Sequence, residues 1–204
     1  MNITLLIIGV TCVISFIAFS NQALLQNLLF YPYRIWKNNE WHRLVSNGFV
    51  HADFQHLLFN MISLYFCGQF VEYAFDDVFK IKGRALYVAM YFGAIIIADV
   101  FNFFKQKDNY EYRSLGASGG VSAVIFASIL FQPFAQFYVP FPVPAFVFGP
   151  LYLLFCAYMA KRGTDNIGHL AHFTGAVFGF VFPIILEPRL FTRFISLVGQ
   201  KFGF

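Results

Sequence analysis

Ser118 is the residue of this 204-residue chain whose surroundings most favour nucleophilic chemistry. It lies in the small-residue stretch GASGG, residues 116–120, at the start of an apolar run that continues to Phe131. Glycines permit a tight turn, and a serine at a helix N-terminus faces unpaired backbone N–H groups that can stabilise an oxyanion. The alternative is a small-residue packing face with an N-cap, so the chemical interpretation depends on a partner for the serine.

A histidine in the last apolar stretch is the best partner for this serine. His172 lies three residues before Gly175, which with Gly179 makes a Gly-x-x-x-Gly face. Such a face lets two helices approach closely, and a neutral imidazole packed against Ser118 can accept its proton as a general base. His169, one turn earlier, is the second candidate for this role. An interhelical hydrogen bond is the alternative role for either histidine.

His56 and Asn60 are spaced i, i+4 and share one face of a helix. Both side chains can donate hydrogen bonds, which suits stabilisation of an oxyanion. A metal site is the competing interpretation, with four possible ligands: His51, His56, His169 and His172. Acidic residues are scarce beside these histidines, and the three cysteines have no metal-binding spacing. We therefore expect no metal, and a Ser–His dyad in place of a triad.

The composition of the chain indicates a membrane protein. Hydrophobic residues make up 59% and charged residues only 12%, whereas soluble domains average about 25% charged residues. The net charge of +4 comes from residues in short loops, which fits anchoring beside a lipid bilayer. No basic patch is interleaved with aromatic residues, so we expect no nucleic-acid partner.

Six apolar segments predict an all-α, polytopic membrane bundle with one domain spanning residues 1–204. The segments cover residues 3–19, 54–75, 85–104, 118–131, 144–160 and 168–186. Most approach the roughly 20 residues that cross a bilayer, and we interpret the first as a retained span and not as a signal peptide. The loop 132–144 is uncharged and contains four prolines, which predicts an irregular aromatic segment on the membrane surface.

The fourth segment is too short to cross the bilayer as a helix. Its 14 residues make about 21 Å of helix, roughly 10 Å less than the hydrocarbon core. If the helix ends at one surface, Ser118 lies at the floor of an intramembrane pocket, because non-helical backbone at that depth must be buried by protein or line a water-filled cavity. A helix that kinks at Pro133 and continues to Tyr138 would remove this argument.

The three polar clusters fall at one end of the expected bundle. If the segments alternate in direction, His56 with Asn60, Ser118, and His169 with His172 all lie toward the side opposite the N-terminus. Eight basic residues flank this side against six on the other, so the positive-inside rule weakly assigns it to the cytoplasm.

These residues resemble the sequence elements of the rhomboid intramembrane serine proteases, of the compact bacterial six-span type. EWHRL at 40–44 resembles the family's Trp-Arg element, and HADFQHLLFNM at 51–61 resembles its His-x4-His-x3-Asn element. GASG at 116–119 is the Gly-x-Ser-Gly nucleophile motif, and AHFTG at 171–175 resembles the histidine motif of the last span. Glu72 also matches a family position.

The resemblance implies a site and a set of supporting residues. Ser118 and His172 would form the catalytic dyad, and His56, Asn60 and the Ser118 amide would form the oxyanion hole. Six residues would have structural or packing roles: Gly116, Gly119, Gly175, Gly179, Glu72 and Arg43. Some relatives have a tyrosine four residues after the nucleophile that stacks on the catalytic histidine, whereas this chain has Ser122.

The resemblance also implies an activity and a location. We expect an endopeptidase that cleaves single-span membrane proteins near helix-destabilising segments, without a cofactor. The fifth span and its flanking loops would form the substrate gate. The protein would be a multi-pass protein of the bacterial plasma (inner) membrane, with its active site open to the extracytoplasmic side. This orientation is opposite to the one that the count of basic residues weakly favours.

Two other functions remain possible on the sequence alone. A catalytically silent rhomboid-like protein would bind membrane clients, although it would have no use for a complete Ser118–His172 pair. A small transporter would use the polar residues as a substrate path, although the chain lacks repeated halves and intramembrane charge pairs. The sequence indicates no oligomeric state.

Overall fold

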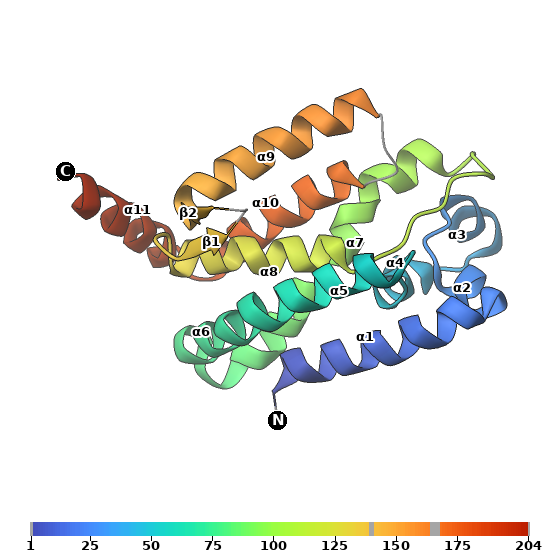
Figure 1. The fold of residues 1–204 in the computed structure, drawn as a ribbon, viewed down its shortest axis with the longest axis horizontal. Helices are drawn as coiled ribbons and strands as arrows, with labels where there is room; N and C mark the ends of the chain where they lie inside the picture. Colours follow the sequence, from blue (N-terminus) through green and yellow to red (C-terminus); the bar gives the residue numbers. More distant parts are fainter. Residues whose placement is uncertain (1, 139–140, 164–167, 204) are drawn as a thin grey trace.

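The computed structural model describes residues 2–138, 141–163 and 168–203, and most of its regular structure is helical (Figure 1). The chain begins with α1 (Ile3–Ser20), α2 (Gln22–Leu28), α3 (Pro32–Asn38), α4 (Arg43–Ser46) and the 3-10 turn η1 (Asn47–Phe49). A continuous helical run follows: α5 (Phe54–Ser63), the π-helical turn η2 (Leu64–Gly68), α6 (Gln69–Phe79), the 3-10 turn η3 (Lys80–Lys82) and α7 (Gly83–Gln106). The last elements are α8 (Ser118–Phe131), β1 (Gln136–Tyr138), β2 (Pro142–Pro144), α9 (Ala145–Arg162), α10 (His169–Leu186) and α11 (Arg189–Phe202).

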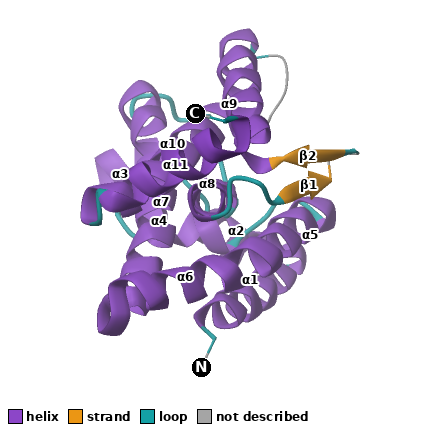
Figure 2. Ribbon diagram, turned by 90° about the vertical axis from the view of Figure 1, so that its left-hand side faces the viewer, coloured by secondary structure: helices purple, strands orange, loops and turns teal. Residues whose placement is uncertain are grey.

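Helix α8 lies at the centre of the bundle, with the other long helices around it (Figure 2). Apart from Ser118 and Ile125, every residue of α8 is buried. A helix that is apolar on all sides has no preferred outer face, so it is stable only where other helices surround it. The nucleophile candidate therefore begins the most enclosed element of the protein.

Glycines allow α8 and α10 to touch through their backbones. A Cβ atom added at Gly175 would lie 2.3 Å from the carbonyl oxygen of Gly119, and one added at Gly179 would lie 2.1 Å from that of Ala123. On the other side of α8, a Cβ at Gly119 would lie 2.6 Å from the Cβ of Ala98 in α7. These separations are too short for any side chain, so α7, α8 and α10 form one closely packed unit.

A buried carboxylate joins α1 to α6. Glu72 accepts hydrogen bonds from the backbone N–H groups of Ile3 and Thr4, each at 2.8 Å, and from the Thr4 hydroxyl. The Thr4 hydroxyl also lies 2.9 Å from the Tyr87 hydroxyl of α7. The carboxylate accepts hydrogen bonds from N–H groups that have no partner within the helix, and its negative charge interacts favourably with the positive end of the α1 dipole. Glu72 thus fixes the start of α1 against two other helices.

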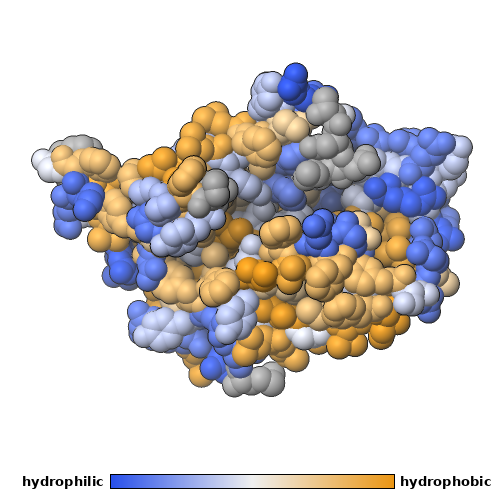
Figure 3. Space-filling model, viewed as in Figure 1, coloured by the Kyte–Doolittle hydropathy of each residue, from blue (hydrophilic) through white to orange (hydrophobic). Residues whose placement is uncertain are grey.

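The outer surface of the long helices is apolar. Large exposed side chains include Phe16 and Ile17 on α1, Phe59 on α5 and Leu154 on α9. In the view of Figure 3, orange hydrophobic atoms cover the lower face over α1 and α5, while hydrophilic atoms gather at the end of the molecule that holds α3. An apolar band of this kind suits lipid as the surrounding solvent.

By length and composition, three helical segments in the described part of the chain can cross a membrane: Ile3–Ser20, Phe54–Gln106 and His169–Leu186. The second turns back on itself, because α7 packs against α6 after η3. The apolar helix Ser118–Phe131 is shorter. The predicted all-α class is confirmed, and a helix or helical run covers all but the first residue, at most, of each of the six expected apolar segments.

The loop 132–144 differs from the expected irregular segment. Strands β1 and β2 pair antiparallel with Phe137 opposite Val143, while residues 139–140 lie outside the described part. Helix α8 ends at Phe131, which confirms the predicted 14-residue helix and excludes the alternative in which it kinks at Pro133 and continues to Tyr138. Proline lacks an N–H group and restricts the residue before it to extended conformations, which favours the strand pair over a longer helix.

Changing Gly179 to alanine tests the backbone contact between α8 and α10. The new methyl group would displace the Ala123 backbone, so we expect a loss of about 1–3 kcal/mol of stability, as for other overpacked sites. Thermal unfolding in detergent micelles measures the effect. The matched control is Gly9→Ala in α1, where no atom lies within 4 Å of the added carbon. Equal melting temperatures for the two variants would contradict the close contact.

Candidate active site

Ser118 is the first residue of α8, and a turn that favours glycine leads into it. Gly116 has a φ of +122°, a backbone conformation that side-chain-bearing residues rarely adopt. The Gly116 N–H donates to the carbonyl oxygen of Asn47 at 3.0 Å, which holds the turn against η1. The first N–H groups of a helix have no partner within it, so the turn presents donors beside the Ser118 side chain.

A buried histidine also holds this turn. The Ala117 N–H donates to Nε2 of His51 at 3.4 Å, and Nδ1 of His51 lies 2.9 Å from the Ser15 hydroxyl of α1. Because Nε2 accepts, Nδ1 carries the proton and donates to Ser15, whose hydroxyl donates to the Phe49 carbonyl oxygen at 2.9 Å. Burial, together with the nearby His56, lowers the pKa of His51 to about 3, which keeps the ring neutral. One tautomer of His51 therefore connects α1 to the residue before Ser118.

His56 lies against the same turn. A Cβ atom added at Gly116 would lie 2.7 Å from Cε1 of His56, so the glycine makes room for the imidazole. The carboxylate of Asp53 caps α5 by accepting the His56 N–H at 2.7 Å, which fixes the start of the helix. The rings of His51 and His56 meet edge to face, with centroids 5.0 Å apart. Both histidines of the 51–61 element therefore contact the serine turn.

Asn60 is buried, and its side chain bonds within its own helix. Nδ2 of Asn60 donates to the His56 carbonyl oxygen at 3.0 Å. The amide group has a second N–H, which remains as a donor for another group. Asn60 does not line the cavity described below, whereas His56 does.

The close contact of α10 with α8 brings His172 toward Ser118. Gly175 follows His172 by three residues, Gly119 follows Ser118 directly, and the backbones of the two glycines touch. The ring of His169 lies beside that of His172, with centroids 6.1 Å apart. The Gly-x-x-x-Gly face therefore fixes the nucleophile and base candidates relative to each other.

A cavity of about 780 Å³ opens onto these residues. Ser118, His56 and His172 all line it, together with polar residues of α7 and of the segment before α8. A polar, roomy cavity between helices can hold water, which peptide hydrolysis requires. The described residues therefore place a serine, two imidazoles and a water-accessible space together at one end of the bundle.

The sequence did not predict the positions of three side chains in this region. Asp99 of α7 is buried and lines the cavity together with Asn47 of η1. Ser122, where some relatives have tyrosine, shares a 3.4 Å hydrogen bond with the Tyr152 hydroxyl of α9. Cys156 of α9 lies close to His169 and His172. Each contact joins separate helices, so spacing along the chain does not reveal it.

Arg43 lies away from the cavity and fastens α4 to α2. Its guanidinium is buried and donates to the carbonyl oxygens of Gln26 and Leu29 at 2.7 and 3.0 Å. It also forms an ion pair with Glu40. Those carbonyls lie at the end of α2, where intrahelical partners are missing, so Arg43 acts as a cap.

Comparison with known proteins identifies the family of these motifs. A family model described as "Rhomboid domain" matches residues 38–189, well over half of the chain. The chain is 29% identical to "RHOMBOID-like protein 12, mitochondrial" of Arabidopsis thaliana over 76% of its own length and 49% of that protein. It is 25% identical to "Putative rhomboid protease YdcA" of Bacillus subtilis (77% and 73%) and 24% identical to "Rhomboid protease AarA" of Providencia stuartii (77% and 60%). The chain thus spans about half the length of the Arabidopsis protein.

The neutral state of His51 predicts a pH dependence of stability. The pKa of His51 is about 3 in the folded protein and about 6.5 in an unfolded chain, so the unfolded state binds more protons between these values. Stability therefore falls as the pH drops below 6.5, by about 2 kcal/mol between pH 7 and pH 5 from this group. In His51→Gln, a neutral amide replaces the ring, and thermal unfolding in micelles should show a smaller loss over the same pH range. An unchanged pH slope would contradict the assignment.

Proposed function

Because the chain belongs to the rhomboid family, we propose that it is an intramembrane serine endopeptidase that cleaves single-span membrane proteins. The observation that carries this proposal is the contact between Gly119 and Gly175, which holds Ser118 and His172 on facing helix ends beside one cavity. A serine and an imidazole placed in this way can act as a nucleophile and its general base.

In the proposed reaction, the Ser118 hydroxyl attacks the scissile carbonyl carbon while His172 takes the hydroxyl proton. The tetrahedral oxyanion receives hydrogen bonds from the Ser118 N–H, His56 and Asn60. His172 then protonates the leaving amine as the peptide bond breaks, which leaves an acyl-serine. A water molecule from the cavity, deprotonated by His172, hydrolyses that ester and restores Ser118.

The proposed topology has six spans in one domain comprising residues 1–204. Helix α1, the α5–α6 run, α7, α8, α9 and α10 would each cross or enter the bilayer, with α8 as the short central helix. The cavity would open on the extracytoplasmic side of a bacterial plasma membrane, where water reaches Ser118 without crossing hydrocarbon. Substrates would enter from the lipid beside α9, which stands at the edge of the bundle (Figure 1). No cofactor takes part in this reaction.

Replacing the dyad residues tests the reaction directly. Ser118→Ala and His172→Ala should each abolish cleavage of a generic single-span substrate in proteoliposomes, because one removes the nucleophile and the other its base. Ser128→Ala is the matched control: this serine lies in the same helix and donates to the Ile125 carbonyl oxygen, away from the cavity. Cleavage by folded Ser118→Ala would refute the nucleophile, and binding of substrate without cleavage by the native chain would favour a silent client-binding protein.

Asn60→Ala should weaken cleavage without abolishing it. Removal of one of several oxyanion donors typically costs about 10²–10³-fold in rate, and here His56 and the Ser118 N–H remain, so we expect roughly 10–1000-fold. The loss should appear in kcat with little change in KM, because the oxyanion forms only along the reaction path. A change confined to KM would show that Asn60 contacts the substrate and does not stabilise the oxyanion.

A further inference from the structure

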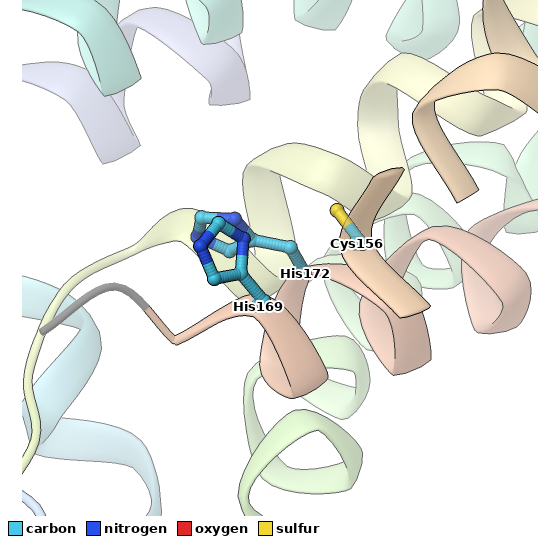
Figure 4. A group of neighbouring side chains, drawn as sticks. All are labelled: Cys156, His169 and His172. Atoms are coloured by element: carbon cyan, nitrogen blue, oxygen red, sulfur yellow. The ribbon is translucent and has the colours of Figure 1, made fainter. Parts of the chain in front are cut away.

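A cysteine and two histidines from neighbouring helices lie close together (Figure 4), and one of them, His172, lines the cavity. Cys156 belongs to α9, while His169 and His172 belong to the first turn of α10. One donor atom of each side chain lies within 4.8 Å of those of the other two. A thiol and two imidazoles at such separations form a potential ligand set, distinct from the histidine set that the sequence suggested.

These donors suit zinc. Thiolate and imidazole ligands bind Zn²⁺ at about 2.3 and 2.0–2.1 Å in tetrahedral geometry, which puts the donor atoms roughly 3.3–3.7 Å apart. Side-chain rotations that move the donor atoms by about an ångström would bring them to these distances. Three protein ligands with the fourth position open to water is a common arrangement for zinc in enzymes. Hard cations such as Mg²⁺ prefer oxygen ligands and would not bind here.

The surroundings of the three residues suit capture of an ion from water. Cys156 and His169 are buried, whereas His172 lines the cavity together with Gly168 and Ala171 of the same helix turn. An ion that enters the cavity therefore meets His172 first and the two buried donors behind it. Burial excludes competing water from the thiolate and strengthens its bond with a cation.

We propose that Cys156, His169 and His172 bind Zn²⁺ and that bound Zn²⁺ inhibits the enzyme. This regulation rests on the proposed role of His172 as the base that accepts the Ser118 proton. A metal ion occupies the nitrogen lone pair that this step needs, so the dyad is inactive while the ion is bound. Removal of the ion by a chelator restores the base, and Cys156 contributes to inhibition without taking part in catalysis.

Metal binding can be measured without any protease assay. Co²⁺ added to the purified protein in detergent should give a thiolate-to-cobalt charge-transfer band and the visible bands of tetrahedral Co²⁺, both removed by excess Zn²⁺. Cys156→Ala should lose the charge-transfer band, and His169→Gln should weaken both signals. Cys12→Ala, which removes a thiol in α1, should behave as the native chain. Absence of the band in the native chain, or its persistence in Cys156→Ala, would overturn the site.

Inhibition is then measured on the same preparations. Zn²⁺, but not Mg²⁺, should inhibit cleavage of a single-span substrate by the native chain and by Cys12→Ala. Cys156→Ala should cleave normally and require at least about tenfold more Zn²⁺ for half inhibition, because it lacks one ligand. Equal sensitivity of the two cysteine variants would overturn the proposal. If the native chain binds cobalt but cleaves nothing, the proposed function is refuted and the metal site is supported. If it cleaves the substrate but binds no metal, the metal site is refuted and the proposed function is supported.

Discussion

The contact between the backbones of α8 and α10 sets the position of the proposed dyad. Gly175 and Gly179 have no side chains, so the α10 backbone lies directly on the carbonyl groups of Gly119 and Ala123. Ser118 is one residue from this contact, and His172 is one helical turn from it. A larger residue at either glycine would separate the helices, and the serine would move away from the imidazole. The proposed chemistry therefore requires glycine at 175 and 179 as well as the Ser118 and His172 side chains.

Hydrogen bonds made by neutral groups hold the turn before Ser118. Nε2 of His51 accepts a hydrogen bond from the Ala117 N–H, and the Nδ1–H donates to the Ser15 hydroxyl, so the first helix of the chain is connected to the serine turn. Asn47 holds the neighbouring Gly116 through its carbonyl oxygen. In a medium of low dielectric constant, a fully satisfied chain of hydrogen bonds is rigid and costly to break. The same low dielectric constant disfavours charge, which suits a base that must begin its reaction cycle as a neutral imidazole.

The sequence predicted what is local and periodic. The boundaries of α8 follow from its apolar run between Ser118 and Phe131, and the composition predicted an all-α membrane protein. The Gly-x-x-x-Gly spacing predicted a close helix contact, although not that its partner atoms would be the carbonyl groups of α8. The pairing of β1 with β2 and the position of Cys156 beside the histidines were missed, because both depend on contacts between segments that no periodicity relates. Asp99 was visible as an acidic residue in an apolar run, but its place at the cavity follows only from the packing of α7.

Covalent labelling of Ser118 tests whether His172 activates this serine. The folded native protein is incubated with a fluorophosphonate, and the modified residue is identified by mass spectrometry, in parallel with His172→Ala. We expect a stable adduct on Ser118 of the native chain and on no other serine, and loss of the adduct in His172→Ala. Failure of the folded native chain to form the adduct, or equal labelling of Ser118 without His172, would contradict it.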